Sequence, residues 1–470
     1  MLFSSTLFLF IFLPAVLLVY FGILRKTSTR NYFLLAASLL FYAWGEPIYV
    51  FLMLFSIFCN YSFGLIIDKT VRSGFKQLWL TAAVILNLGI LFYFKYSRFF
   101  ISNLNVFLEL QLELPDVVLP IGISFFTFQA MSYVIDVYRK TTQVQKNPLY
   151  LALYVSFFPQ LIAGPIVRYS TIEQQIQHRT VTLDGFESGV CRFIQGFGKK
   201  VLLSNVMSLT AEHVFSLAVQ QQLSVSLAWL GALAYTFQIY FDFSGYSDMA
   251  IGMGHMFGFR FDENFRHPYL SRSVSEFWNR WHISLGQWFR DYVYFPLGGS
   301  RVSKMKLLRN LFAVWLLTGI WHGAAWQFIF WGLGYGILIS LEKLTNFPKR
   351  LKSRPAITAY GIFTFLTVVV GWVFFGSQGL QSALYQLSTM FGLNSAVFWE
   401  PFATYTLREY GVYFILAAIF STPLPSRLTQ HLKRNLIFHI AKTIMYMAVL
   451  ILSVSFLAMG VHNPFIYFNF

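Results

Sequence analysis

Residues 48–67 read IYVFLMLFSIFCNYSFGLII, an apolar run without a single charged side chain. A helix of about 20 such residues is long enough to cross the hydrocarbon core of a bilayer. The whole chain has the same character, because 56% of its 470 residues are hydrophobic and 11% are charged. A soluble domain has about 25% charged residues. The composition therefore predicts an all-α polytopic membrane protein.

Basic residues fall in short clusters between the apolar runs, as they do in cytoplasmic loops. Their spacing predicts about ten crossings plus two partial elements, with both termini outside the cytoplasm. The net charge of +16 thus reflects membrane topology, and no nucleic-acid partner is expected. The clusters are RKTSTR (25–30), DKTVRSGFK (68–76), YRKTTQVQK (138–146), residues 260–310, EKLTNFPKRLKSR (342–354) and SRLTQHLKRN (426–435).

Two apolar stretches are predicted to be irregular. Residues 149–167 are interrupted by Pro159 and by Gly164-Pro165, which favours a re-entrant element over a full crossing. A segment ending in GFGKK (196–200) is predicted to be amphipathic and to lie along the cytoplasmic face. The chain is interpreted as a single domain, 1–470, with N-terminal helices (1–146), a catalytic core (147–345), and C-terminal helices with an aromatic tail (346–470).

Polar side chains interrupt an apolar helix at YFDFSGYSDMAIG (240–252). Asp242, Ser244 and Asp248 are costly in a membrane, where ionisable groups are usually functional. Two interpretations remain open: the three residues lock neighbouring helices together, or they line a polar cavity. Gly245 and Gly252 would permit close approach of another helix.

Cationic and aromatic residues alternate in SEFWNRWHISLGQWFRDYVYFPLGGSR (275–301). Its Arg280, Arg290 and Arg301 suit bidentate binding of phosphates. One interpretation is contact with membrane lipid headgroups, and the other is a site for a phosphorylated cytoplasmic cofactor. Gly298-Gly299 would permit an anion-binding turn.

A histidine lies inside LLTGIWHGAAW (316–326). Segments 311–321 and 324–341 leave from and return to basic loops, so they are predicted to form a hairpin, or a re-entrant pair, with His322 near its turn. The small residues around His322 are expected to leave space, with Trp321 and Trp326 as apolar walls. Two interpretations of His322 are open: it hydrogen-bonds a neighbouring helix, or it acts as a general base, since histidine suits proton transfer near neutral pH. No metal-ligand spacing is present, and Cys59 and Cys191 lie far apart, so no metal is predicted.

Several motifs follow in an order that carries a resemblance over nearly the whole chain. The chain resembles the membrane-bound O-acyltransferase family, most closely its bacterial branch typified by the alginate O-acetylase membrane subunit. The motifs are FYAW (41–44), LPIGISF (119–125), YVIDVYR (133–139), LIAGPI (161–166), YFDFSGYSDMAIG (240–252), ENF-x-x-PY (263–269), EFWNRWHISL (276–285), W-x-RDY-x-Y (288–294), LGG-x-R (297–301) and G-x-WHG (319–323).

The resemblance implies a bundle of about 10–12 transmembrane helices with re-entrant elements and a central tunnel between cytoplasmic and extracytoplasmic funnels. It implies an acyltransferase of the bacterial inner membrane that moves acetyl from a cytoplasmic donor, acetyl-CoA, to an extracytoplasmic polysaccharide such as alginate. His322 matches the family's invariant histidine and His282 its second, inner histidine.

Further roles follow from the same resemblance. The donor would be held by Arg280, Arg290, Arg301 and Trp281, and Asn279 or a backbone N–H would stabilise the oxyanion. Asp242, Ser244, Asp248 and Trp321 would line the tunnel. No bound cofactor is expected. The expected partners are an extracytoplasmic SGNH-type acetyltransferase and an exopolysaccharide biosynthesis complex.

The chain ends in HNPFIYFNF (462–470), which is either an interfacial aromatic anchor or a functional tail. In the second interpretation, Tyr467 accepts the acyl group and passes it on. Peptidoglycan O-acetylation and teichoic-acid D-alanylation are alternatives with the same chemistry. A proton-coupled transporter that uses Asp242 and Asp248 is an alternative of a different class.

Overall fold

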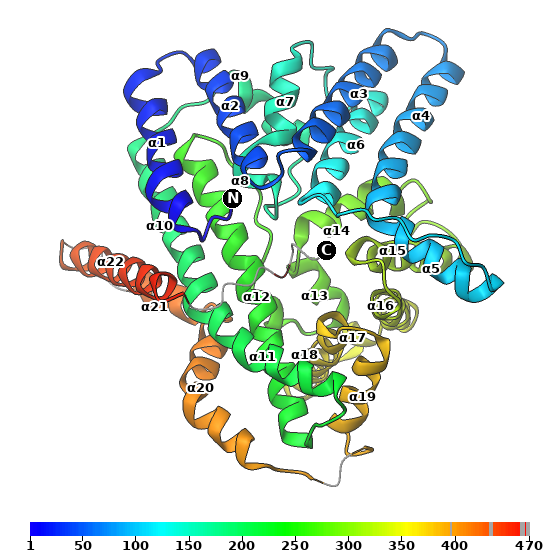
Figure 1. Ribbon diagram of the computed structural model, residues 1–470, viewed down its shortest axis with the longest axis vertical. Coiled ribbons are helices and arrows are strands. Elements are labelled where there is room, and N and C mark those ends of the chain that lie inside the picture. Colours follow the sequence, from blue (N-terminus) through cyan, green and yellow to red (C-terminus); the bar gives the residue numbers. More distant parts are fainter. Residues whose placement is uncertain (395–396, 432–435, 461–465, 467–470) are drawn as a thin grey trace. The chain divides into compact units, whose positions relative to one another are not determined.

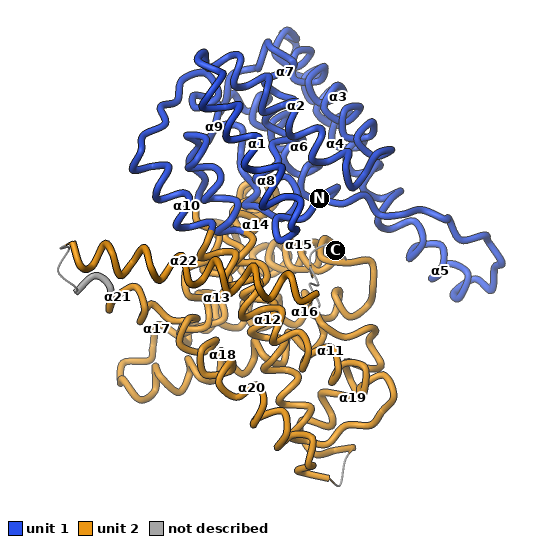
Figure 2. The backbone as a smooth tube through the Cα atoms, turned by 60° about the vertical axis from the view of Figure 1, so that its left-hand side comes forward, with its two compact units in different colours: residues 1–193, 247–262 blue, residues 194–246, 263–470 orange. Residues whose placement is uncertain are grey.

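The computed structural model describes residues 1–394, 397–431, 436–460 and 466. Within these ranges every regular element is a helix and there is no strand (Figure 1). The chain forms two compact units, which Figure 2 distinguishes by colour. Unit 1 contains residues 1–193 and 247–262, and unit 2 contains residues 194–246 and 263–470. The all-α prediction is confirmed.

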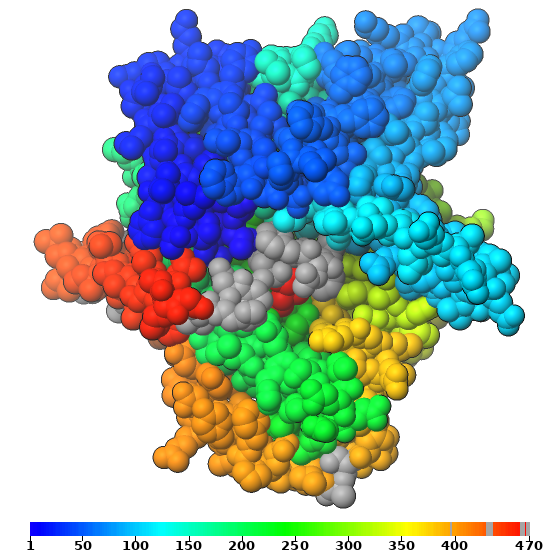
Figure 3. Space-filling view, in the orientation of Figure 1, coloured from blue at the N-terminus to red at the C-terminus, as the bar shows by residue number. Residues whose placement is uncertain are grey.

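Unit 1 is built mainly from the N-terminal helices. Its first π-helical and α-helical turns follow one another, and α5 with the loop after it projects from the rest of this unit (Figure 3). The elements are η1 (Phe8–Phe12), α1 (Leu13–Leu18), η2 (Val19–Ile23), α2 (Thr27–Gly45), α3 (Tyr49–Lys69), α4 (Ser73–Leu91), η3 (Phe92–Tyr96), α5 (Ser97–Leu108), α6 (Ile123–Arg139), α7 (Pro148–Ser156), α8 (Phe158–Leu161), α9 (Tyr169–Gln177) and most of α10 (Leu183–Gly198).

The helix predicted to be interrupted within residues 149–167 is interrupted in the structure. Between α7 and α8, Phe157 has φ −54° and ψ 110°, which no α-helix can continue through. Pro159 follows within the first turn of α8, where its missing N–H costs no helical hydrogen bond. Residues 151–167 are all buried, so protein side chains surround the interrupted backbone, as a membrane requires.

Unit 2 contains the longer part of the chain. A helical hairpin, α15 and α16, makes its most extensive helix–helix packing. The elements are η4 (Lys199–Ser204), α11 (Asn205–Val219), α12 (Val225–Met256, whose last ten residues belong to unit 1), η5 (Pro268–Leu270), α13 (Val274–Arg280), α14 (Ile283–Phe289), η6 (Arg290–Tyr294), α15 (Lys304–His322), α16 (Trp326–Thr345), α17 (Phe347–Arg350), α18 (Arg354–Gly376), α19 (Leu380–Met390), α20 (Pro401–Phe420), α21 (Leu424–His431) and α22 (Leu436–Ala458).

Six helical stretches in the described chain are long and apolar enough to cross a membrane. A helix of about 20 apolar residues has the necessary length, and several crossings make the chain a multi-pass membrane protein. The stretches are Tyr49–Lys69, Ser73–Leu108, Leu183–Val219, Trp326–Thr345, Arg354–Gly376 and Leu436–Ala458.

The helix predicted to end at GFGKK does not end there. Residues 183–219 are continuously helical, and Lys200 is 2% exposed inside that helix. Its Nζ lies 2.6 Å from Oδ1 of Asp242 on α12. The carboxylate offsets much of the cost of burying this cation, so this lysine does not mark a loop. A Cβ at Gly245 would lie 2.7 Å from the Gly196 carbonyl oxygen, which shows why the crossing of these two helices requires glycine.

Candidate active site

His322 is the last residue of α15, at the turn of the α15–α16 hairpin. The predicted hairpin is confirmed, but the two glycines beside the histidine leave no gap between the helices. A Cβ at Gly319 would lie 2.5 Å from the Phe328 carbonyl oxygen, and one at Gly323 would lie 2.3 Å from the Phe328 ring. The expectation of open space was wrong because these glycines let the two helices approach each other closely.

Three aromatic rings surround the His322 imidazole, which is 2% exposed. Its centroid lies 4.9 Å from the Trp321 ring, 5.0 Å from the Trp331 ring and 5.0 Å from the Phe375 ring. Trp321 was predicted as a wall, but Trp326, the other predicted wall, is 43% exposed. The periodicity of α16 could have identified Trp331, because Phe328, Trp331 and Tyr335 are its buried face. No local signal points to Phe375 on α18.

The second histidine, His282, lies between α13 and α14 in a left-handed backbone conformation (φ 44°, ψ 53°). This conformation is uncommon for a residue other than glycine and often marks a functional position. Neighbouring backbone holds it: the Ile283 N–H donates to the Asn264 carbonyl at 3.0 Å, and the Arg266 N–H donates to the Arg280 carbonyl at 3.0 Å. Residues 264–266 therefore fix the break between the two helices.

The Asn264 side chain determines which nitrogen of His282 carries a proton. Its Oδ1 accepts from the Ser284 N–H at 3.2 Å and from the Ser284 hydroxyl at 2.9 Å, and it lies 3.2 Å from His282 Nδ1. A backbone N–H can only donate, so the atom facing it is the amide oxygen, and Nδ1 must carry the proton. The basic lone pair of the neutral imidazole is then on Nε2.

Burial keeps this imidazole neutral. His282 is 2% exposed, and burial lowers the pKa of His282 to about 3, because the charged form loses its hydration. The Phe243 ring packs edge-on against the imidazole at 4.6 Å. His282 is therefore a neutral group with a fixed tautomer.

Trp321 brings the two histidines into one site. Its ring centroid lies 4.9 Å from that of His322 and 6.0 Å from that of His282. All three residues belong to unit 2. The site therefore joins the break between α13 and α14 to the turn of the α15–α16 hairpin through one tryptophan.

The other residues of segment 275–301 lie in different environments. Asn279 is exposed on α13, whereas Trp281 is 1% exposed and packs against the Trp372 ring at 4.8 Å. A guanidinium nitrogen of Arg280 lies 2.5 Å from Glu276 on the same helix. Arg290 lies 3.1 Å from its neighbour Asp291 and is half-exposed. Arg301 is exposed. The predicted contacts of the arginines and Trp281 with the donor, and of Asn279 with the oxyanion, stay predictions.

The Gly298-Gly299 turn is left-handed at both glycines, with φ 100° and 59°. Its N–H groups, however, do not present an anion site. They donate to the carbonyls of Phe295 and Tyr294, at 2.9 Å each, and so close the end of η6. Buried Asn310 donates to the Gly299 carbonyl at 3.2 Å. The pair serves as a helix C-cap, for which glycine is favoured.

The carboxylates of α12 both form ion pairs with a neighbouring helix. Asp242 pairs with Lys200 in unit 2, and Asp248 pairs with Arg192 at 2.9 Å in unit 1. Ser244 is 2% exposed. These contacts match the interpretation in which polar residues lock helices together, and a tunnel-lining role stays a prediction.

Asp242 also binds the backbone of Ile466. Its Oδ2 accepts a hydrogen bond from the Ile466 N–H at 2.9 Å, and Ile466 is 8% exposed. Tyr467, the predicted acyl carrier, lies outside the described residues. The residue before it is thus bonded to the middle of α12.

The part of the chain that contains this site is similar to known proteins. The sequence model of MBOAT, the membrane-bound O-acyltransferase family, matches residues 143–384, which include both histidines and Asn264. The chain is 45% identical over 402 residues to a "Probable alginate O-acetylase AlgI" of Pseudomonas aeruginosa, covering 84% of this chain and 76% of that protein.

More distant relatives share the family. The peptidoglycan O-acetyltransferase of Helicobacter pylori is 39% identical over 432 residues, covering 84% of this chain and 80% of that protein. The teichoic acid D-alanyltransferase of Bacillus subtilis is 30% identical over 275 residues, covering 55% of this chain and 69% of that protein.

Proposed function

Because the chain belongs to the membrane-bound O-acyltransferase family, we propose that it transfers acetyl from a cytoplasmic thioester, acetyl-CoA, to hydroxyl groups of an extracytoplasmic polysaccharide such as alginate. The observation that carries this proposal is the site itself. A buried histidine at a hairpin turn is enclosed by three rings and linked through Trp321 to a second, neutral histidine. The similarity to alginate O-acetylases supports acetyl as the group and alginate as the acceptor.

His322 acts as general base in this proposal. Its imidazole takes the proton of the acceptor hydroxyl, and the hydroxyl oxygen attacks the thioester carbonyl carbon. The carbon–sulfur bond then breaks, and the leaving thiolate takes the proton from the imidazolium. Such a base contributes about 10²–10⁴-fold. The walls of Trp321, Trp331 and Phe375 support this role because they keep water from the thioester.

His282 is the inner histidine. With its proton on Nδ1, it presents Nε2 as a fixed acceptor that can orient the reacting groups without gaining charge. Arg280, Arg290 and Arg301 bind the phosphates of acetyl-CoA, and Asn279 or a backbone N–H stabilises the oxyanion. Trp281 supports the donor site from the protein core, where its ring packs against that of Trp372.

The tail provides a route for the acetyl group. The hydrogen bond from Ile466 to Asp242 supports a tail that folds back so that the Tyr467 phenol receives the acetyl group and passes it to a separate SGNH-type transferase of an exopolysaccharide complex. In this proposal both termini lie outside the cytoplasm and the protein lies in the bacterial inner membrane. Mass spectrometry of the C-terminal peptide from active cells should detect acetyl-Tyr467. Full activity in Tyr467→Phe, with no modified peptide, would refute this route.

Peptidoglycan is the second candidate acceptor, because the Helicobacter pylori relative is similar over most of both chains. The test is to delete the gene and measure O-acetyl groups on isolated alginate and on isolated peptidoglycan. Loss from one polymer, restored by the wild-type gene but not by His322→Ala, identifies the acceptor. Unchanged acetylation of both polymers, together with proton uptake by vesicles that contain the protein, would instead support the transporter alternative.

A further inference from the structure

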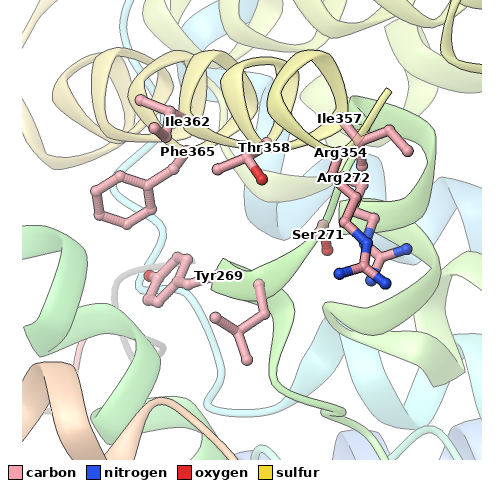
Figure 4. A pocket seen from close by; sticks show the side chains of 10 residues that line it. Tyr269, Ser271, Arg272, Arg354, Ile357, Thr358, Ile362 and Phe365 are labelled. Atoms are coloured by element: carbon pink, nitrogen blue, oxygen red, sulfur yellow. The ribbon is translucent and has the colours of Figure 1, made fainter. Parts of the chain in front are cut away.

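A cavity of about 850 Å³ lies in unit 2 beside the start of α18. None of the residues assigned above to the reaction lines it. Its walls come from η5 with the residues after it and from α18 (Figure 4). A volume of this size is typical of sites for small organic ligands. The side chains that matter most are Tyr269, Arg272, Arg354, Ile362 and Phe365, with Gly361 on the wall.

One end of the cavity is cationic. Figure 4 shows the guanidinium groups of Arg272 and Arg354 side by side. The nearby carboxylates bind other groups than these two guanidiniums: Glu276 pairs with Arg280 at 2.5 Å and accepts the Arg272 backbone N–H at 2.9 Å, and Glu342 accepts the first N–H groups of α13 at 2.8 Å. Within the described part of the chain, neither Arg272 nor Arg354 forms an ion pair with a carboxylate. Two adjacent guanidiniums without a counter-ion attract an anion, and phosphate fits their planar donors.

The other end is apolar and opens outward. Tyr269, Ile362 and Phe365 line it (Figure 4), and Ile362 is 57% exposed. α18 is one of the candidate membrane spans, with only 28% of its most apolar window buried. An exposed apolar face on a membrane span contacts acyl chains. The cavity therefore joins a phosphate-binding end to a wall that faces hydrocarbon.

We propose that this cavity binds an anionic glycerophospholipid. Its phosphate lies on Arg272 and Arg354, and one acyl chain follows Ile362 and Phe365. Basic residues beside a membrane span attract anionic lipids at the interface, and here two of them converge on a concave site. The phosphates of a soluble thioester donor share the headgroup chemistry but would leave the hydrocarbon-facing wall unused. This inference requires only a multi-pass membrane protein and does not rest on the proposed reaction.

Native mass spectrometry of the full-length protein tests the charge requirement. The detergent-solubilised protein is mixed with phosphatidylglycerol and phosphatidylcholine in equal amounts. The wild type should retain phosphatidylglycerol preferentially, and Arg272→Gln/Arg354→Gln should lose roughly tenfold or more of that retention. The matched control, Arg350→Gln/Lys352→Gln, removes two charges from the adjacent basic segment and should retain the lipid. Equal loss in both variants, or no loss in either, would overturn the proposal.

A steric variant tests the cavity without altering charge. A Cβ at Gly361 would lie 3.6 Å from the Ser271 carbonyl oxygen, an ordinary contact, so Gly361→Leu should fold while its side chain fills the cavity. Gly334→Leu is the control, because Gly334 on α16 has no atom within 4 Å of its added Cβ. Gly361→Leu should lose phosphatidylglycerol and Gly334→Leu should keep it, with unfolding temperatures in lipid-free detergent verifying both folds. Retention in a folded Gly361→Leu would contradict the assignment.

Competition distinguishes the lipid from soluble phosphates. Glycerol 3-phosphate and acetyl-CoA are added separately to the protein loaded with phosphatidylglycerol. The lipid should remain bound in both cases, because its acyl chain contributes binding that neither competitor supplies. Displacement by glycerol 3-phosphate would reduce the site to a phosphate site, and displacement by acetyl-CoA would assign the cavity to the acyl donor. Either result overturns the lipid proposal.

Discussion

The two histidines of the site are equally buried, each 2% exposed, yet their surroundings differ. The rings of Trp321, Trp331 and Phe375 enclose His322, whereas an amide oxygen of Asn264 lies 3.2 Å from Nδ1 of His282. A hydrogen-bond acceptor fixes the tautomer of His282. In the proposed mechanism His322 transfers the proton and His282 orients the reacting groups.

Replacing the first histidine should have the largest effect. His322→Ala should reduce acetyl transfer by about 10²–10⁴-fold, because the general base is lost. O-acetyl groups on polysaccharide isolated from cells that carry each variant in place of the wild-type gene measure it. His213→Ala on α11, which removes a histidine in ring contact with Phe402, is the control and should stay active. Comparable losses of acetyl transfer in both variants would contradict a specific role of His322.

The next largest effect is expected at the aromatic rings that enclose His322. Trp331→Ala should admit water to His322, so that roughly tenfold more thioester is hydrolysed per acetyl transferred. Trp326→Ala is the matched control, since Trp326 is 43% exposed and lies on the same helix. The ratio of free acetate to acetylated acceptor measures the outcome. If Trp326→Ala raised the ratio and Trp331→Ala did not, the wall assignment would be reversed.

A smaller change should convert the second histidine into a group that titrates. Asn264→Asp places a carboxylate beside His282, and an opposite charge raises the pKa of a histidine. In the wild type, His282 stays neutral because burial lowers its pKa to about 3. The variant should therefore lose several-fold of its rate as the pH falls from about 8 to about 5, beyond any loss in the wild type. Asn264→Gln keeps an amide, so its rate should not show this additional fall at low pH. Superimposable profiles for all three proteins would contradict the role given to Asn264.

The smallest effect is on stability. The unfolded state protonates His282 near its usual pKa of about 6.5, whereas the folded state resists protonation until a pH of about 3. Stability from this group is therefore complete above about 6.5 and falls as the pH drops below it, by at most about 1.4 kcal/mol per pH unit. His282→Asn should show a shallower decline of unfolding temperature between these pH values. A steeper decline than in the wild type would contradict a neutral His282.

Local patterns were sufficient where the chemistry is local. The basic clusters around 311–341 predicted the hairpin that ends at His322, and the prolines in 149–167 predicted a broken helix. The sequence misplaced Lys200 because a cationic pair normally marks a loop, and only the carboxylate of Asp242 on another helix allows burial. Long-range contacts of this kind cannot be read from one segment.

The same limit applies inside the site. Trp331 was identifiable from the buried face of α16, but Phe375 depends on how α18 packs. Asn264 lies in a motif that carries the family resemblance, but its role depends on the fold, which brings its amide oxygen to 2.9 Å from the Ser284 hydroxyl and 3.2 Å from His282 Nδ1. The Gly298-Gly299 turn had the predicted flexibility, but its N–H groups are used within the turn.

The central claim is that His322 mediates transfer from a donor on one side of the membrane to an acceptor on the other. The direct test uses proteoliposomes of defined orientation, with labelled acetyl-CoA at the side of the basic loops and, at the opposite side, the SGNH-type transferase with its polysaccharide acceptor. The wild type should place label on the acceptor without acetyl-CoA crossing, and His322→Ala in the same orientation should place none. Transfer by His322→Ala at the wild-type rate, or label that appears only on the donor side, would contradict the account.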